Sequence, residues 1–367
     1  MSNKKIVRYN LDNIDEKNAT INIIYGERSN GKSYQVKHKK AVLKYLRTGS
    51  RFILMRRWKE EISTEKIEAY FADVDIVKIT EGKYNCITMY RKTLYLSNYD
   101  VESGKTTKGE KIGYVVALST EQNYAGASYL DVNDIIFEEF MSRSEYLHNE
   151  ADKLMNFYST VDRKRGTTKL WLVGNSISRV CPYLLDWDIA NIIRTLKQGQ
   201  IREKYLGTNT FDDNNNEIMI KLAIEYCQDT GKTSFAIGKH KDMLNKGSWQ
   251  SEPQPHLPKS RKCYRCCYRI LFFYKGFKFA GEYLIDNIDN TRCWYVYPFT
   301  KDIQDKILVF SDEVRISKWW QRDIYNPNIN NQKLKDLLNT FKENMIFYST
   351  DLAGTDFKQA IDFTIKK

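Results

Sequence analysis

A glycine-rich turn at residues 26–33 carries the clearest chemical signal in the sequence. Gly26, Gly31, Lys32 and Ser33 complete the pattern Gly-x-x-x-x-Gly-Lys-Ser. The glycines let the backbone curl so that its N–H groups point inward, where they bind phosphate together with the positive end of the next helix. The lysine meets the outer phosphates and the serine hydroxyl binds Mg²⁺. The pattern predicts a site for ATP and Mg²⁺, with an ordinary glycine turn as the alternative.

The segments on both sides of the turn have the order that a phosphate loop needs. Residues 21–25 (INIIY) are typical of a buried parallel strand, and residues 32–49 of a helix that stops at Gly49. A second Gly-Lys-Thr begins at Gly231, but Tyr226 occupies the position of the first glycine, so we interpret it as a plain turn. Three further loop residues are assigned to the cofactor site: Arg28, Ser29 and Asn30.

Two adjacent glutamates follow the apolar residues 135–137. ATP hydrolysis needs one carboxylate that holds Mg²⁺ through water and a second that orients or deprotonates the attacking water. We expect Glu138 to serve the metal and Glu139 to act as catalytic base, both reaching the loop from a neighbouring strand. The alternative is a charged strand end that faces solvent.

Two later segments supply further candidates. Asn175 follows the apolar residues 170–173 and is placed to contact the γ-phosphate, although an asparagine turn explains it as well. A helix predicted over residues 151–166 ends at Arg163 and Arg165. Arginine at the rim of an ATPase domain can complete a neighbouring subunit's site, whereas a basic helix end also complements its own dipole. Both interpretations of the arginines remain open.

The composition is that of a folded, basic protein. A chain of 367 residues with 42% hydrophobic residues is long enough for two or three domains. The 58 Lys+Arg exceed the 46 Asp+Glu, and the net charge of +12 favours a polyanionic partner, although a soluble protein can be basic without one. The odd count of seven cysteines, an N-terminus without a signal-peptide core and the lack of a long apolar stretch lead us to expect a reducing cytoplasm and no membrane span.

Alternating strands and helices predict one doubly wound α/β domain over residues 1–200. Its strands are almost continuously apolar, as in parallel sheets that are covered on both faces. A hairpin is expected around Arg91 and Lys92, an exposed Gly- and Lys-rich loop over residues 102–111, and an amphipathic segment that includes Tyr70 as an apolar position.

The composition changes after residue 200. Residues 211–217 are turn-rich and residues 218–227 have short helical periodicity, so we expect a small linker domain over residues 201–250. Three prolines follow, and then aromatic strand segments and a helix over residues 334–345, which predict an α+β domain over residues 251–367.

Several stretches together resemble a known family. GERSNGKS, RFILMRRWKE, DIIFEEFMSR, STVDRKRG and GNSISRVCPYLL, in this order and spacing, are similar to the genome-packaging (encapsidation) ATPases of small podophages with protein-primed DNA. Those proteins are ring ATPases of the ASCE, RecA-like P-loop NTPase class. The similarity covers most of residues 20–190.

The resemblance implies a homopentameric ring at the portal vertex of an empty capsid, which drives double-stranded DNA through the portal with ATP. It implies action in the host cytoplasm and absence from the mature virion, and it leaves open a structural RNA as a docking partner. It assigns Arg163 to the finger that acts in a neighbouring subunit and Arg56 to a basic segment beside the nucleotide. The family usually has Asp where this chain has Glu138, so the charge is kept but the side chain is one methylene longer.

The resemblance also implies that the last domain is a vestigial ribonuclease H-like nuclease. The sequence agrees, because a two-metal nuclease needs several converging carboxylates, and Asp286 and Asp289 alone do not make a site. Seven basic residues between Glu252 and Glu282, interleaved with aromatic ones, suit a DNA backbone that is contacted without base reading; a solvated strand edge is the alternative. Two residues of this domain, Lys262 and Arg265, are assigned to DNA contact. Three lysines of the exposed loop in the first domain are assigned to the same role: Lys105, Lys108 and Lys111.

These observations favour an ATP-driven DNA translocase of a packaging motor. A helicase or a DNA pump of another system is one rival, and a non-hydrolysing structural protein of the virion is a second, against which Glu139 and the complete phosphate loop argue. An active nuclease is disfavoured by the missing carboxylates.

Overall fold

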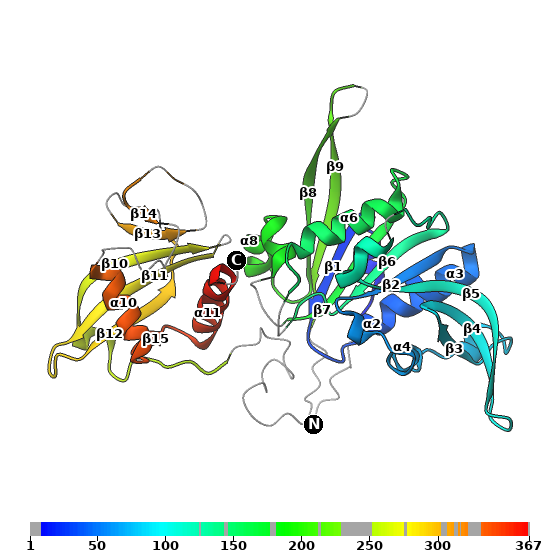
Figure 1. Ribbon diagram of the computed structural model, residues 1–367, viewed down its shortest axis with the longest axis horizontal. Coiled ribbons are helices and arrows are strands. Elements are labelled where there is room, and N and C mark those ends of the chain that lie inside the picture. Colours follow the sequence, from blue (N-terminus) through cyan, green and yellow to red (C-terminus); the bar gives the residue numbers. More distant parts are fainter. Residues whose placement is uncertain are drawn as a thin grey trace. The chain divides into compact units, whose positions relative to one another are not determined.

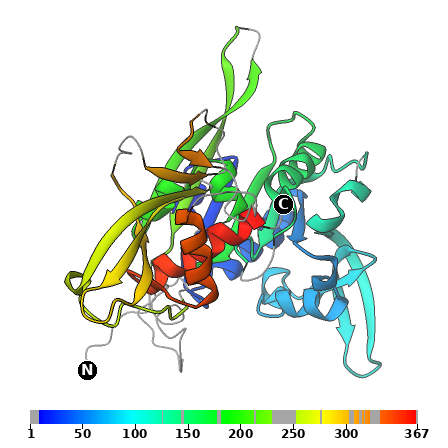
Figure 2. The ribbon, with the colours of Figure 1, turned by 60° about the vertical axis from the view of Figure 1, so that its left-hand side comes forward.

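The computed structural model describes residues 9–124, 126–142, 146–176, 181–211, 214–228, 252–274, 277–301, 307–311, 315, 317–321 and 332–365. The described residues fall into two compact units (Figures 1 and 2). The first unit holds those up to residue 176 and from 191 to 228, and the second holds those from 181 to 190 and from 252 onward.

A nine-stranded sheet with the order β3-β4-β5-β2-β6-β7-β1-β9-β8 forms the first unit. The six strands from β5 to β9 in this order run parallel, while β3 and β4 at one edge and β8 at the other are antiparallel to their neighbours. The mixed α/β fold with a large parallel sheet confirms the predicted fold class. The strands are β1 (Ile21–Gly26), β2 (Arg51–Arg56), β3 (Cys86–Tyr90), β4 (Thr93–Asp100), β5 (Lys105–Ala117), β6 (Val132–Glu138), β7 (Lys169–Asn175), β8 (Gln200–Phe211) and β9 (Glu217–Tyr226).

Helices follow the central strands, as the alternation in the sequence predicts. The helix after the phosphate loop ends at Gly49, whose left-handed backbone (φ 72°) is the expected helix stop. The helices of the first unit are α1 (Asp12–Asp15), α2 (Lys32–Val36), the π-helical η1 (Lys37–Leu43), α3 (Lys44–Thr48), η2 (Lys59–Glu61), α4 (Thr64–Phe71), α5 (Ile76–Ile79), η3 (Leu118–Tyr124) and α6 (Glu150–Asp162). Helix α7 (Pro182–Asp186) belongs to the second unit, and α8 (Ala190–Thr195) returns to the first after its first residue.

The β3–β4 hairpin is confirmed, but the predicted loop at residues 102–111 is wrong. Arg91 and Lys92 both have positive φ, as a two-residue hairpin turn requires. Strand β5 starts at Lys105, because Thr106 and Thr107 pair with β4 and the chain turns at Gly104. Glycine and lysine suggested a loop, yet the cross-strand ladder decided the structure.

Residues 200–226 belong to the large sheet of the first unit. The helix predicted over residues 218–227 is wrong, because β9 pairs in parallel with β1 and buries Leu222, Ala223 and Ile224. A short buried run cannot be assigned to helix or strand from periodicity alone. The hairpin β8–β9 thus occupies the start of the expected linker domain, and residues 229–251 lie outside the described residues.

The second unit is an α+β fold, as predicted, around a six-stranded sheet with the order β14-β13-β10-β11-β12-β15. Phe357 packs against Phe272 and Phe279, and Leu337 joins the same core. The ribonuclease H-like assignment stays a prediction. The elements are η4 (Arg261–Cys263), β10 (Tyr264–Tyr274), β11 (Phe277–Asp286), β12 (Arg292–Pro298), β13 (Leu308–Ser311), β14 (Trp320–Gln321), α10 (Gln332–Lys342), β15 (Ile346–Tyr348) and α11 (Asp351–Ile365).

Candidate nucleotide site and basic surfaces

Two glycines of the loop at residues 26–33, the predicted phosphate loop, occupy positions where a larger residue would not fit or would be strained. Gly31 has φ 98°, a backbone conformation that residues other than glycine rarely adopt. A Cβ atom on Gly26 would lie 3.0 Å from the Cβ of Cys227, because β9 passes close to the loop. The first position is therefore dictated by tertiary packing and the second by the turn itself. Arg28 and Ser29 are exposed at the loop tip.

Lys32 points into its own loop. Its side chain is buried, and Nζ donates to the carbonyl of Glu27 and to Oδ1 of Asn30 (3.2 Å). Burial lowers the pKa of Lys32, with nearby charges opposing this shift. The ammonium group is thus held by neutral acceptors, for which anionic phosphate oxygens would be stronger partners.

Glu138 is brought to the loop. Its Oε2 accepts a hydrogen bond of 2.9 Å from the hydroxyl of Ser33, and its Oε1 accepts one of 2.7 Å from the hydroxyl of Tyr70. Burial raises the pKa of Glu138, while the bonds from Tyr70 and Ser33 oppose this. Burial also raises the pKa of Tyr70 well above its ordinary value, so that the phenol remains a donor. A serine hydroxyl beside a carboxylate is an oxygen donor set of the kind that Mg²⁺ prefers, so these residues fit the metal.

The expected adjacency of the strands is wrong. Strand β7 lies between β1 and β6, so the glutamates do not come from a strand next to β1. The contact between Ser33 and Glu138 forms because the helix after the loop begins over the carboxyl ends of these strands. Asn175, the last residue of β7, lies opposite Gly26 in the register and thus stands beside the loop.

Glu139 is placed differently from Glu138, although the two are neighbours in sequence. Its backbone is left-handed (φ 57°), an uncommon conformation for a residue other than glycine, and its side chain is 60% exposed. Nη2 of Arg56 lies 3.2 Å from its Oε2, and Nε of Arg56 lies 3.6 Å from Glu61. Arg56 is therefore shared between two acids at the end of β2.

A buried ion pair supports this edge of the sheet and was missed by sequence reasoning. Arg57 donates from Nε to both carboxylate oxygens of Glu150 (2.9 and 3.0 Å) and from Nη1 and Nη2 to the carbonyls of Glu139 and Phe140. It therefore fixes the backbone next to the proposed base. The run Arg56-Arg57 gave a signal, but the sequence did not show which arginine faces the site.

The two arginines after α6 have different surroundings. Arg165 donates to the carbonyls of Leu130, Val132 and Val161, so it braces the fold. Arg163 is exposed, and its Nη2 donates to the carbonyl of Ala127 (2.8 Å). No contact within the described chain joins either arginine to Lys32, Ser33 or Glu138.

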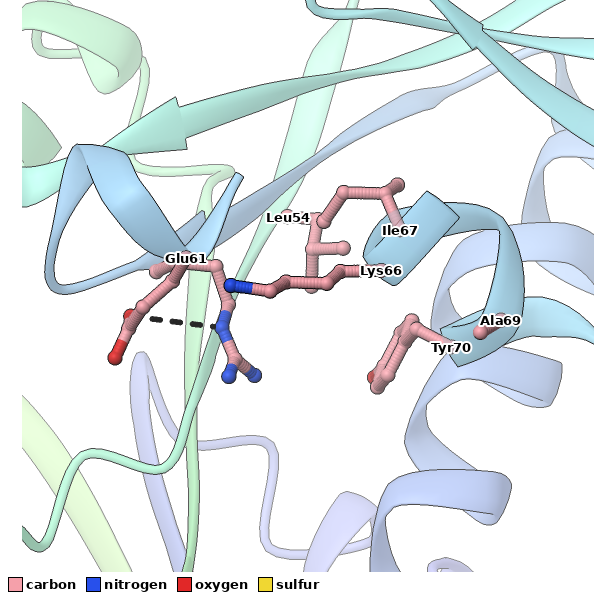
Figure 3. A pocket seen from close by; sticks show the side chains of 7 residues that line it. Leu54, Glu61, Lys66, Ile67, Ala69 and Tyr70 are labelled. Carbon is pink, nitrogen blue, oxygen red and sulfur yellow. Dashed lines mark ion pairs between the residues drawn. The ribbon is translucent and has the colours of Figure 1, made fainter. Parts of the chain in front are cut away.

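A pocket of about 510 Å³ lies beside both carboxylates. Tyr70 and Arg56 line it, and these residues contact Glu138 and Glu139 respectively. Figure 3 shows Lys66 and Tyr70 projecting from α4, with Glu61 across the pocket. Its other lining residues are Leu54, Ile67 and Ala69.

The lysines assigned to DNA in the first unit lie on a strand, not a loop. Figures 1 and 2 show that the β4–β5 hairpin extends beyond the body of this unit. Lys105 and Lys108 are exposed on it. Lys108 stacks over Tyr90 (3.7 Å to the ring centroid) and Lys111 over Tyr114 (4.1 Å), so these cations lie on aromatic rings at the surface.

The basic stretch of the second unit is more neutralised than the sequence suggests. Glu282 pairs with Arg261 and Arg269, at 2.6 Å each, and Lys259 pairs with Asp286 (2.7 Å). Antiparallel pairing of β10 and β11 places Glu282 directly opposite Arg269. The two residues are 13 positions apart in the sequence, so the sequence alone did not reveal this ion pair. Lys262 and Arg265 are exposed and have no ion pair among the described residues, whereas Lys275 lies outside that part of the chain.

Comparisons with known proteins agree with this architecture. Residues 3–236 match the family described as Podovirus DNA encapsidation protein (Gp16). A DNA packaging protein of Bacillus phage phi29 is 24% identical over 312 residues, which are 81% of this chain and 84% of that protein. A DNA packaging protein of Bacillus phage B103 is 31% identical over 174 residues, or 45% of this chain and 47% of that protein.

A solved structure has the same fold. A chain of the bacteriophage phi29 viral genome packaging motor assembly matches with a TM-score of 0.55 and 19% identity, over 97% of this chain and 99% of that one. Among the described residues, no helix combines the length and the apolar character of a membrane span.

Proposed function

As this chain belongs to the Podovirus DNA encapsidation protein (Gp16) family, we propose that it is the ATPase of a viral genome-packaging motor, which hydrolyses ATP to move double-stranded DNA into a preformed capsid. Its relatives are DNA packaging proteins, and the similar structure comes from a packaging motor assembly. The observation that carries the proposal is the contact between Ser33 of the phosphate loop and Glu138, 105 residues away.

The loop and its lysine bind the nucleotide. Inward N–H groups of the loop, together with Lys32, hold the phosphates, and Lys32 exchanges its carbonyl and amide acceptors for phosphate oxygens. Ser33 and Glu138 would hold Mg²⁺, which neutralises charge on the phosphates. Asn175 and the exposed Arg28 lie at the rim of the same loop.

Glu139 is the proposed general base. A carboxylate oxygen can accept a proton from the attacking water only when it is not bound to Arg56. Either the second oxygen of Glu139 serves as the base while Arg56 stays bound to Oε2, or the ion pair between Arg56 and Glu139 breaks before the reaction. Arg57 keeps the backbone carbonyl of Glu139 in place through these changes. Base catalysis of this kind contributes about 10²–10⁴ in rate.

Arg163 is the proposed finger that acts in a neighbouring subunit of a ring, for which a pentamer is our expectation. Its exposure and its lack of a role within its own site support this. The exposed Lys105 and Lys108, and Lys262 and Arg265 of the second unit, are proposed to contact DNA phosphates. The protein would act in the host cytoplasm at the portal of the capsid, with a structural RNA as an untested further partner.

The test is release of phosphate from ATP by the purified protein with duplex DNA and the cognate capsids. We expect wild type to be active and Lys32→Ala to be inactive, since the loop loses its cation. Arg163→Ala subunits, mixed into wild type, should reduce activity more steeply than in proportion to their share, because each site then depends on its neighbour.

Two outcomes would overturn the proposal. Equal phosphate release by wild type and Lys32→Ala would favour a non-hydrolysing structural protein. Separation of the strands of a labelled duplex, without uptake of DNA into capsids, would favour a helicase. A loss of activity strictly proportional to the share of Arg163→Ala subunits would contradict the role of Arg163 in a neighbouring subunit's site. It would leave the rest of the proposal intact.

A further inference from the structure

Both oxygens of the Glu138 carboxylate are held by hydroxyl groups from two different helices. Ser33 of α2 donates to Oε2 and Tyr70 of α4 donates to Oε1. We propose that Tyr70 is a positioning residue that holds Glu138 in the geometry needed for Mg²⁺, and that it compensates for the extra methylene of glutamate at this position. This inference rests on the proposed function of the site.

Tyr70 is itself fixed by its surroundings. Its ring packs edge-on against Phe71 (4.9 Å between centroids), and the ammonium of Lys37 lies 4.5 Å from the ring centroid. Lys37 also donates to the carbonyl of Tyr70 and pairs with Asp73, which ties α4 to the helix that follows the phosphate loop. The phenol therefore reaches Glu138 from a support that is linked to the loop itself.

The helix that carries Tyr70 has a defined start and a buried face. The hydroxyl of Ser63 accepts the backbone N–H of Lys66 at the N-terminus of α4, and Ile67 and Phe71 join the core of the first unit. The exposed side of Tyr70 lines the pocket in Figure 3. The hydroxyl thus lies where a packed helix meets an open pocket, next to the carboxylate.

Glutamate at this position needs such a partner more than aspartate does. Its side chain has one more rotatable bond, so ordering a glutamate costs more side-chain entropy than ordering an aspartate. A hydroxyl that donates to one carboxylate oxygen limits this freedom and leaves lone pairs for the water shell of the metal. Loss of a hydrogen bond behind a metal-binding group typically lowers metal affinity by about 10–100-fold.

The experiment measures binding of a fluorescent ATP analogue to the full-length protein, first in EDTA and then as Mg²⁺ is added. In Tyr70→Phe we expect affinity in EDTA to equal that of wild type, and the Mg²⁺ concentration for half-maximal tightening to rise about 10–100-fold. The matched control is Tyr45→Phe, which removes a hydroxyl that donates to Glu110 (3.2 Å), and it should behave as wild type.

A double-mutant cycle tests the link to the glutamate. In Glu138→Asp the shorter side chain loses its contact with the phenol, so adding Tyr70→Phe should change the Mg²⁺ requirement by less than about threefold. Unchanged Mg²⁺ dependence of Tyr70→Phe, an equal loss of affinity with EDTA and Mg²⁺, or additive effects in the cycle would each overturn the positioning role. If wild type itself bound the nucleotide without any effect of Mg²⁺, the proposed function would fall with it.

Discussion

Glu138 of the first unit and Glu282 of the second are both buried glutamates on strands, but their partners differ. Glu138 receives two neutral hydroxyl groups, and burial raises its pKa. Glu282 receives two guanidinium groups and the hydroxyl of Tyr297, so although burial raises its pKa, the bonds from Arg269 and Arg261 lower it overall. Burying a charged carboxylate costs free energy, and an ion pair or a bound metal ion offsets that cost. We therefore propose that Glu138 binds a metal ion, whereas Glu282 is already neutralised by two arginines.

The same contrast separates the two units. In the first, the acids lie at the ends of strands beside a phosphate loop. In the second, Asp286 is likewise paired, with Lys259. That the second unit contacts DNA instead of cutting it stays a prediction.

The largest expected effect tests the contrast directly. We expect Glu138→Gln to lower the ATPase rate by at least about 100-fold, since a bound metal stabilises transition-state charge by several kcal/mol. We expect Glu282→Gln to leave the rate within about twofold but to cost about 2 kcal/mol in the free energy of unfolding, because two arginines lose a charged acceptor. The rates come from phosphate release and the stabilities from urea denaturation. A large rate loss in Glu282→Gln would break the comparison.

Glu225 sharpens the contrast because its hydrogen-bond partner among the described residues is also neutral. It accepts a hydrogen bond from Tyr9 (2.8 Å), and burial raises its pKa to about 7. A raised folded-state pKa means that stability is fully present below the unfolded value of about 4.3 and is lost as the pH rises through about 7. We expect the first unit to be up to about 3 kcal/mol less stable at pH 8 than at pH 4.5 from this group.

Urea denaturation of wild type and Glu225→Gln at both pH values checks this. The difference between the pH values should shrink in the variant, because the amide does not titrate. An unchanged difference would show that other groups cause it. Retained ATPase activity in Glu225→Gln would show that a neutral hydrogen-bond partner alone does not make a buried glutamate part of the metal site.

The smallest expected effect concerns the cations of the second unit. Lys262 and Arg265 lack acidic partners among the described residues, whereas Lys259 is paired with Asp286 and Asp289. We expect Lys262→Ala and Arg265→Ala each to lower the salt dependence of duplex DNA binding by about one phosphate contact, and Lys259→Ala to leave it unchanged. Binding is measured at several salt concentrations with duplexes of two unrelated sequences. Equal effects from all three variants would mean that net charge alone matters.

Local sequence patterns were sufficient for some elements and not for others. Strand β1, the helix stop at Gly49, the β3–β4 hairpin and strands β10, β11 and β12 were predicted because turn residues and strand-forming residues act over short distances. Strand β9 and the start of β5 were missed because their state depends on a partner strand. For β9 that partner is β1, and the paired residues Ile21 and Leu222 are 201 positions apart in the chain, so no local window contains the deciding contact.

The sequence by itself determined which chemical groups this protein has: the complete pattern Gly-x-x-x-x-Gly-Lys-Ser, two adjacent glutamates after an apolar segment, and an excess of basic residues. Only the tertiary structure decided which of these groups meet. It brought the hydroxyl groups of Ser33 and Tyr70 into hydrogen-bond contact with Glu138. It paired Glu139 with Arg56, and Glu282 with Arg261 and Arg269. The physical reason is that the charge and solvation of a side chain depend on neighbours within a few ångströms, and sheet pairing and helix packing choose those neighbours from distant parts of the chain.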